Sequence, residues 1–351
     1  MPATPRDNTF DIDKFQFRGL HPDVFLGTAS DRYAGWLGQI YTPERYVGRI
    51  TKRSHDVGGK TFAEEVLPVE SVAEYFDHFR VVELDFTFYR PIADSAGKPT
   101  QTHQILRQYR QHLRESDRII LKVPQVVFAQ KLRRGSGFTA NPDYLQPDLF
   151  IRQFYEPATD LFGSLLTAMV FEQEYQRQSD RREPLDFARD LHAFFGAIPP
   201  DQRYQVELRT ESYLAAPVFE VFRKYRVGQV LSHWTWLPPL QRQFDLAGRT
   251  FLNSGGQSVV RLMTPRNIRY EDAYARAHPF NRQVDGMMNV RMLEETVQLM
   301  HTAIREQVQI NIIVNNRAGG NAPVIAQHIA GRFLESSLNP GSHSNPAPRT
   351  P

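Results

Sequence analysis

The chain of 351 residues contains no cysteine. This absence excludes disulfide bonds, thiolate nucleophiles, cysteine-ligated zinc and iron–sulfur clusters. It also fits a reducing compartment. Residues 1–15 hold no apolar segment typical of a secretory signal, so we expect a cytoplasmic protein. No run of 18 apolar residues is present, which predicts that the chain has no membrane partner.

Several signatures of known chemistry are also missing. The sequence has no HExxH, Walker A, GxGxxG, GxSxG or EF-hand motif, and no pair of histidines marks a metal site. We therefore predict no cofactor. If Glu83, Glu172, Glu207 and His233 gathered around an ion, this oxygen-rich set would suit Mg²⁺ or Mn²⁺ better than zinc, although Lys122 would repel the cation. The net charge of +3 says little about nucleic acid.

Short apolar segments alternate with helical patterns along most of the chain. They are residues 24–28, 81–85, 118–123, 165–172, 204–208, 227–232, 258–263 and 309–315. Segments of this kind are typical of strands buried on both faces of a parallel sheet. They predict an α/β protein with one (β/α)₈ TIM-type barrel; a doubly wound sheet is the alternative. We expect one domain over 21–338, an N-terminal arm over 1–20 and a disordered tail over 339–351.

A long segment rich in glycine and basic residues, 29–68, follows the first predicted strand, with a turn expected at Gly58-Gly59. Loops of this length are usually functional or disordered. Its basic part, 45–60, and two later basic groups are expected to form a positive lip over the barrel. The later groups are Lys131, Arg133, Arg134, Arg177, Arg181 and Arg182. The acidic neighbours Glu174 and Asp180 favour the alternative that these charges are simply solvated.

Most of the predicted strands end in a polar residue, and the C-terminal strand ends of such barrels meet at the active site. These residues are Thr28, Glu83, Asp85, Lys122, Glu172, Glu207, Arg209, Ser232 or His233, Arg261 and Asn315. A carboxylate in a buried strand is costly unless it is paired or functional. We interpret the group as a catalytic pocket; the alternative is a salt-bridge network that closes the barrel.

Roles within this pocket follow from residue type. Glu207 or Glu172 is predicted to be the general base, and Lys122 to stabilise developing negative charge. Glu83 is expected to pair with Lys122 and to orient it.

A glycine-rich turn, NNRAGGNAP, separates the last predicted strand from a helix that Asn321 is expected to cap. Gly319 and Gly320 allow close backbone approach, and a helix N-terminus presents free N–H groups. This predicts an anion site to which Arg261 and Arg317 add positive charge; an ordinary glycine turn is the alternative. The residues assigned to substrate or anion binding are Arg261, Asn315, Asn316, Arg317, Gly319, Gly320, Arg209, Tyr89, Arg90 and His233.

In these segments the chain resembles the YecE-like family, also called domain of unknown function 72, from about residue 24 to 333. The matching residues are Leu26-Gly27-Thr28, Val82-Glu83-Leu84-Asp85-Phe86-Thr87-Phe88-Tyr89-Arg90, Lys122-Val123-Pro124, Phe171-Glu172, Val206-Glu207-Leu208-Arg209, Ser212, Arg261 and Val314-Asn315-Asn316. The resemblance implies a TIM-type barrel and no established reaction. Asp85 stands where the family usually has asparagine, and Thr210 and Leu262 stand where it often has histidine.

Three functions are compatible with these observations. The first is a hydrolase or lyase that acts on a phosphorylated or otherwise anionic substrate, such as a sugar phosphate or nucleic acid. The second is a non-catalytic protein that binds nucleic acid or a partner through the basic lip and nearby aromatic side chains. The third is a metal-dependent enzyme of the sugar isomerase or endonuclease type.

Overall fold

The computed structural model describes residues 10–135, 137–252 and 255–338. Its centre is a closed barrel of eight parallel strands. In order of their neighbours these are β1 (Val24–Ala29), β12 (Gln309–Val314), β11 (Gln257–Leu262), β10 (Gly228–His233), β9 (Tyr204–Glu207), β8 (Leu166–Glu172), β5 (Arg118–Lys122) and β4 (Val81–Leu84). The predicted TIM barrel is confirmed, and each strand agrees with its expected segment to within one residue at either end. The predicted tail, 339–351, lies outside the described residues.

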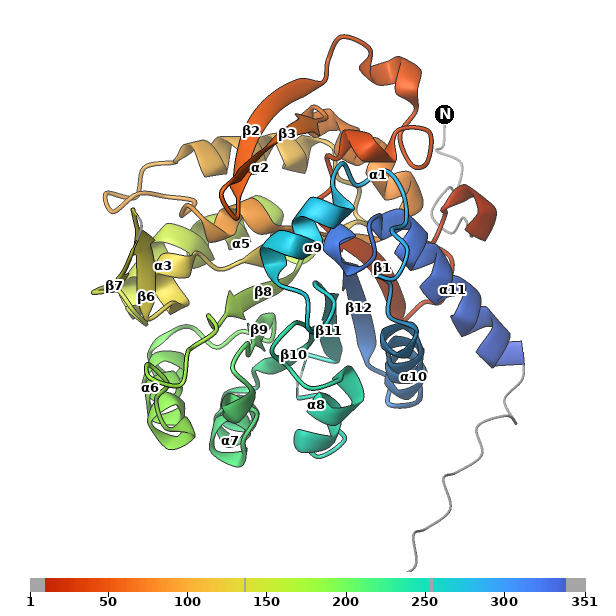
Figure 1. Cartoon of the computed structure of the whole chain (residues 1–351). Coiled ribbons are helices and arrows are strands. Elements are labelled where there is room, and N and C mark those ends of the chain that lie inside the picture. The colour runs from red at the N-terminus through yellow and green to blue at the C-terminus, as the bar shows by residue number, and fades with distance from the viewer. Residues whose placement is uncertain (1–9, 136, 253–254, 339–351) are drawn as a thin grey trace, which may run out of the picture.

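Most of the helices surround the barrel as an outer layer, whereas α9 (Tyr270–Ala277) lies at its mouth (Figure 1). The helices of the outer layer are α1 (Val72–His78), α2 (Gln101–Gln111), α3 (Gln125–Phe128), α4 (Pro147–Phe150), α5 (Glu156–Phe162), α6 (Pro184–Ala197), α7 (Ala216–Tyr225), α8 (Leu240–Leu246), α10 (Val290–Arg305) and α11 (Ala322–Leu338). The π-helical turn Ile151–Tyr155 joins α4 to α5. In the described part of the chain no helix has both the length and the apolar character needed to cross a bilayer.

Strand register decides which polar side chains enter the barrel. Glu83 lies level with Ala29 of β1, and Arg261 lies level with Ser232 of β10. Side chains alternate along a strand, so neighbours at one level share a face. The guanidinium of Arg261 contacts Glu83 although β11 and β4 are not adjacent, which identifies this face as the barrel interior.

Thr28 belongs to the opposite face. Its backbone N–H donates to the Tyr75 hydroxyl of α1 at 2.9 Å, and its own hydroxyl lies 3.0 Å from the same oxygen. Thr28 was predicted to line the pocket, and this prediction is wrong. The side chain that points into the barrel at the end of β1 is that of the next residue, Ala29.

The arm before the barrel is tied down by one buried arginine. Arg18 is 1% exposed and donates to the carbonyls of Phe76 and Phe79 and to Asp117 Oδ1, at 2.8–2.9 Å. These bonds fix the described part of the arm to α1 and to the start of β5.

The segment predicted as a long loop, 29–68, contains a β-hairpin made of β2 (Thr51–Val57) and β3 (Lys60–Val66). Its turn lies at Gly58-Gly59, as predicted. Arg53 pairs with Glu64 across the strands at 2.8 Å. Phe62 packs on Tyr274 of α9 with ring centroids 5.0 Å apart. Figure 1 shows this hairpin extending above the barrel.

Candidate active site

Six charged side chains meet inside the carboxyl end of the barrel. Three are the carboxylates Glu83, Glu172 and Glu207, and three are the cations Lys122, Arg209 and Arg261. Each comes from the end of a strand or, for Arg209, from two residues beyond one. This charge network is formally neutral, because its three carboxylates balance its three cations.

Arg261 is the centre of the charge network. Its Nη2 lies 2.7 Å from Glu83 Oε1, and its Nη1 contacts Glu207 and lies 3.5 Å from Glu172 Oε2. The Ser232 hydroxyl donates to Glu207 Oε1 at 2.6 Å. Glu83 and Glu207 are therefore both held by one guanidinium, and Arg261 is occupied by protein carboxylates instead of being open to an anion.

Glu172 bridges the remaining cations. Its Oε1 lies 2.6 Å from Arg209 Nη1, and its Oε2 accepts a hydrogen bond from Lys122 Nζ. The prediction that Lys122 pairs with Glu83 is wrong: the lysine is on β5 and turns toward β8, whereas the longer arginine from β11 crosses the barrel to Glu83.

The charge network is buried unevenly. Glu83 and Glu207 are 0% exposed and Arg261 is 1% exposed, whereas Lys122 and Glu172 are each 6% exposed. Lys122 lies over the Phe88 ring at 4.0 Å, and Arg209 lies over the Trp234 ring at 4.3 Å. The side of the network formed by Lys122, Glu172 and Arg209 is thus nearest to solvent, and Glu83, Glu207 and Arg261 lie beneath it.

Burial and neighbouring charge set the protonation states. Burial would raise the pKa of Glu172, but Arg209, Lys122 and Arg261 outweigh it and hold this pKa at about 2. Burial raises the pKa of Glu83 despite Arg261. Burial lowers the pKa of Lys122, and the two arginines oppose the effect of Glu172 on it. Glu172 is therefore ionised at neutral pH, and Lys122 gives up its proton more readily than an ordinary lysine.

Several buried polar atoms of the charge network have no hydrogen-bond partner among the described residues. They are Glu83 Oε2, Arg209 Nε and Arg261 Nε. An unpaired buried atom of a charged group costs free energy that a packed apolar residue would not. Fold stability alone therefore does not account for this arrangement.

The glycine-rich turn does not form the expected anion cradle. The N–H groups of Gly319 and Gly320 donate to the Asn316 carbonyl, and the Ala322 N–H donates to Asn316 Oδ1. A side chain at Gly320 would lie 2.5 Å from the Arg282 carbonyl, so the glycines serve close packing. The alternative of an ordinary capped turn is the one observed: Asn321 Oδ1 accepts from the Val324 N–H at 3.0 Å.

The other residues assigned to this turn have structural partners as well. Asn315 accepts from the Arg317 N–H at 3.0 Å, and Asn316 Oδ1 also accepts from Trp36 Nε1. The Arg317 guanidinium lies over the Tyr270 ring at 4.5 Å. Arg317 therefore lies near the barrel rim, but the turn that follows it does not form the anion site that was predicted there.

His233 does not enter the pocket. It lies level with Leu262 and one residue after Ser232, so it faces the helices instead of the barrel interior. Burial lowers its pKa to about 4, and the imidazole is neutral. The assignment of His233 to substrate binding is contradicted by this register.

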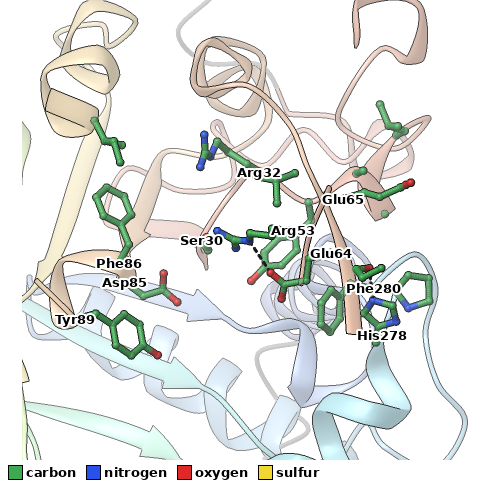
Figure 2. A pocket seen from close by; sticks show the side chains of 18 of the residues that line it. Ser30, Arg32, Arg53, Glu64, Glu65, Asp85, Phe86, Tyr89, His278 and Phe280 are labelled. Atoms are coloured by element: carbon green, nitrogen blue, oxygen red, sulfur yellow. Dashed lines mark hydrogen bonds and ion pairs between the residues drawn. The ribbon is translucent and has the colours of Figure 1, made fainter. Parts of the chain in front are cut away.

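A cavity of about 600 Å³ lies beside the charge network, under the β2–β3 hairpin. Of the residues assigned to substrate or anion binding, Tyr89 and Arg90 line it, and so does Asp85. The strand ends at Leu84, so Asp85 begins the 3₁₀ turn Asp85–Phe88 instead of continuing the face of Glu83. Figure 2 shows Asp85, Phe86 and Tyr89 on one wall, with Phe280 and His278 opposite. Arg90 contacts Gln101 at 3.5 Å and does not pair with Asp85.

Two residues of this region were not assigned from the sequence. Arg32 lines the cavity, and Asp31 is buried behind it, where the Tyr109 hydroxyl donates to its Oδ1 at 2.7 Å. Burial raises the pKa of Asp31 to about 6. The available signal was a pair of charged residues shortly after a buried strand, as Arg209 follows β9.

The expected basic lip is largely neutralised. Residues 131–134 and 137–140 form a second hairpin, β6 (Lys131–Arg134) and β7 (Gly137–Ala140). Lys131 pairs with Asp180 at 2.9 Å, Arg182 pairs with Asp190, and Arg181 donates to the Gln176 carbonyl. These contacts support the alternative of solvated loop charge.

No group of three or more histidine, aspartate or glutamate side chains within the described residues is arranged to hold a metal ion. The carboxylates that were considered as ligands are bound to lysine and arginine. The metal-dependent alternative therefore has no ligand set in this part of the chain.

Comparison with known proteins gives a consistent assignment. The structure is similar to a DUF72 family protein from Thermotoga maritima MSB8, with a TM-score of 0.53 and 15% identity over 89% of this chain and 99% of the other. It is also similar to a DUF72 family protein from Enterococcus faecalis V583, with a TM-score of 0.52 and 16% identity over 93% of this chain and 100% of the other. No curated protein matches the sequence. The family model described as protein of unknown function DUF72 matches residues 25–350, and the chain belongs to this family.

Proposed function

We propose that this protein is an enzyme, a hydrolase or a lyase, that acts on a small anionic substrate at the carboxyl end of the barrel. The observation that carries the proposal is the buried charge network with its unpaired atoms. Replacing such networks by apolar residues is often neutral or stabilising, so their presence at a barrel mouth favours a catalytic use.

The proposed roles follow from how exposed each residue of the charge network is. Lys122 and Arg209 bind the anionic group, because they are the cations nearest to the mouth. In hydrolysis, water attacks the anionic group, the bond to the leaving oxygen breaks, and Lys122 donates a proton to that oxygen and recovers one from the attacking water. In a lyase reaction the carbon next to the leaving group gives up the proton instead, and a double bond forms. The lowered pKa of Lys122 favours the donation. Glu172 positions Lys122. This revises the earlier assignment of Glu207 or Glu172 as general base. Glu207 is fully buried and bound to Ser232 and Arg261, and Glu172 is bound to Lys122 and Arg209.

The two alternatives have less support. A protein that binds a nucleic-acid backbone needs cations free to meet phosphates, whereas Lys131 and Arg182 are paired with aspartates. The metal-dependent enzyme needs a ligand set that the described residues do not offer.

Turnover on a panel of anionic compounds tests the proposal. Purified protein is assayed for hydrolysis or elimination on phosphate monoesters, phosphodiesters and carboxylate esters. We expect activity on at least one class, and a loss of about 10²-fold or more in K122M and E172Q. E183Q, which changes an exposed glutamate in the loop after β8, is the matched control and keeps full activity. A wild type inactive on every class, or an E172Q variant as active as wild type, contradicts the proposal.

A further inference from the structure

The cavity under the β2–β3 hairpin has aromatic side chains on two opposed walls. On one wall Phe86 stacks on Tyr109, with ring centroids 6.1 Å apart and an angle of 27° between the planes. On the other, Tyr33 meets Phe280 edge to face at 5.2 Å. The volume of about 600 Å³ is within the range of small-molecule sites. The walls are suited to a flat ring, which gains free energy by packing between aromatic faces.

Two arginines of the cavity are available to a ligand. Arg53 is paired with Glu64. By contrast, among residues 10–135, 137–252 and 255–338 neither Arg32 nor Arg90 has a carboxylate within ion-pair distance, and the contact of Arg90 with Gln101 is long at 3.5 Å. In Figure 2, Arg32 lies above the space between Phe86 and Phe280. Guanidinium groups bind phosphate and carboxylate in a bidentate manner, so these two provide an anion position at the rim.

Asp85 gives the cavity a hydrogen-bond acceptor. Its carboxylate lines the space, and no hydrogen bond or ion pair to it is found in the described part of the chain. An ionised carboxylate accepts hydrogen bonds only, so it is complementary to the hydroxyl or amino groups of a ligand. The cavity therefore combines a ring position, an anion position and an acceptor.

From these three features we infer that the cavity binds an anion that carries a flat heteroaromatic ring, of the size of a nucleoside monophosphate. The ring lies between the Phe86 and Phe280 walls, Arg32 and Arg90 hold the anionic group, and Asp85 accepts from a hydroxyl. The inference goes beyond the proposed function, because it assigns a second binding site whose lining includes none of Lys122, Glu172 and Arg209, and its test is binding and not turnover.

Calorimetric titration with adenosine 5′-monophosphate, ribose 5-phosphate and adenosine tests it. We expect the nucleotide to bind at least about tenfold more tightly than either fragment, because each fragment lacks either stacking or the charge-assisted bonds. Ribose 5-phosphate binding as tightly as the nucleotide overturns the ring position. Adenosine binding as tightly overturns the anion position, and no binding of the nucleotide overturns the whole inference.

Variants assign the site to the cavity. R32Q and R90Q are expected to weaken nucleotide binding about tenfold each, since each removes charge-assisted bonds. F86L is expected to weaken it while leaving ribose 5-phosphate unchanged. R133Q changes an exposed arginine of β6 and is the control. Unchanged affinity in R32Q, R90Q and F86L, with melting temperatures near that of the wild type, places the nucleotide elsewhere and overturns the inference.

The two proposals can fail separately. E172Q is expected to bind the nucleotide normally, because Glu172 does not line the cavity. If the cavity variants leave binding unchanged but turnover of simple anions still depends on Glu172, only the inference about the cavity fails. If the nucleotide binds as expected but no anionic compound is turned over, only the proposed function fails.

Discussion

Lys122 and Glu172 share one ion pair, yet the surroundings act differently on each. Glu172 is met by three cations, and their combined attraction exceeds the cost of its burial. Lys122 is met by one close carboxylate, while Arg209 and Arg261 repel its positive charge. At the scale of the residue, the charge network therefore fixes an ionised carboxylate next to a lysine that releases its proton below its ordinary pKa.

The lysine pKa can be measured directly. After ¹³C-methylation of the lysines, NMR titration is expected to show Lys122 titrating below its ordinary value of 10.5. E172Q should lower this pKa further, since it removes the charge that favours the ammonium form. The unfolded chain binds more protons than the folded one between the lowered pKa and 10.5, so this residue makes the fold more stable as pH rises through that window. E183Q should not move the signal, and titration of Lys122 at or above 10.5 would be the contrary result.

At the scale of the element, periodicity and chain order were enough to predict the barrel but not the hairpins. Each barrel strand is a short apolar run buried on both faces, a pattern that remains visible in a sequence. The β2 and β3 strands carry Lys52, Arg53, Glu64 and Glu65, and cross-strand ion pairs connect them. These ion pairs depend on which residues face each other across the hairpin, and the sequence does not show that directly. The segment was therefore predicted to be a basic loop. The choice of partners in the charge network was missed for a related reason, because it depends on side-chain reach across the barrel.

Gly27 lies where the first and second strands of the barrel, β1 and β4, approach each other closely. A Cβ added there would lie 2.0 Å from the Val81 carbonyl of β4, inside the contact distance of any two such atoms. G27A is expected to lower the free energy of unfolding by about 1–3 kcal/mol, because the strands must move apart. Urea denaturation measures the change. G137A on the exposed strand β7, where an added Cβ meets nothing within 4 Å, should have little effect, and equal stability of the two variants would contradict the close approach.

At the scale of the whole molecule, the charge network connects strands that are not neighbours. Arg261 of β11 reaches β4, β8 and β9, and Lys122 of β5 joins through Glu172, so five strands share one group of charges inside the barrel. If this group existed to hold the barrel closed, replacing it by apolar residues would destabilise the fold in proportion to the charges removed. If it is retained for a reaction, the fold should tolerate apolar replacement of the fully buried charges, but not the removal of Arg261 alone, which leaves buried carboxylates without their cation.

Comparing a single with a triple variant separates these cases. R261M leaves Glu83 and Glu207 buried without their main cation, and the free energy of unfolding should fall by about 3–5 kcal/mol. The triple variant E83L/E207L/R261M removes the carboxylates along with the arginine and leaves Glu172 with Lys122 and Arg209. We expect it to recover most of the lost stability in urea denaturation while remaining inactive, because Lys122 no longer has its surrounding charges. A triple variant less stable than R261M would mean that the network closes the barrel, and it would remove the main argument for a catalytic use of these residues.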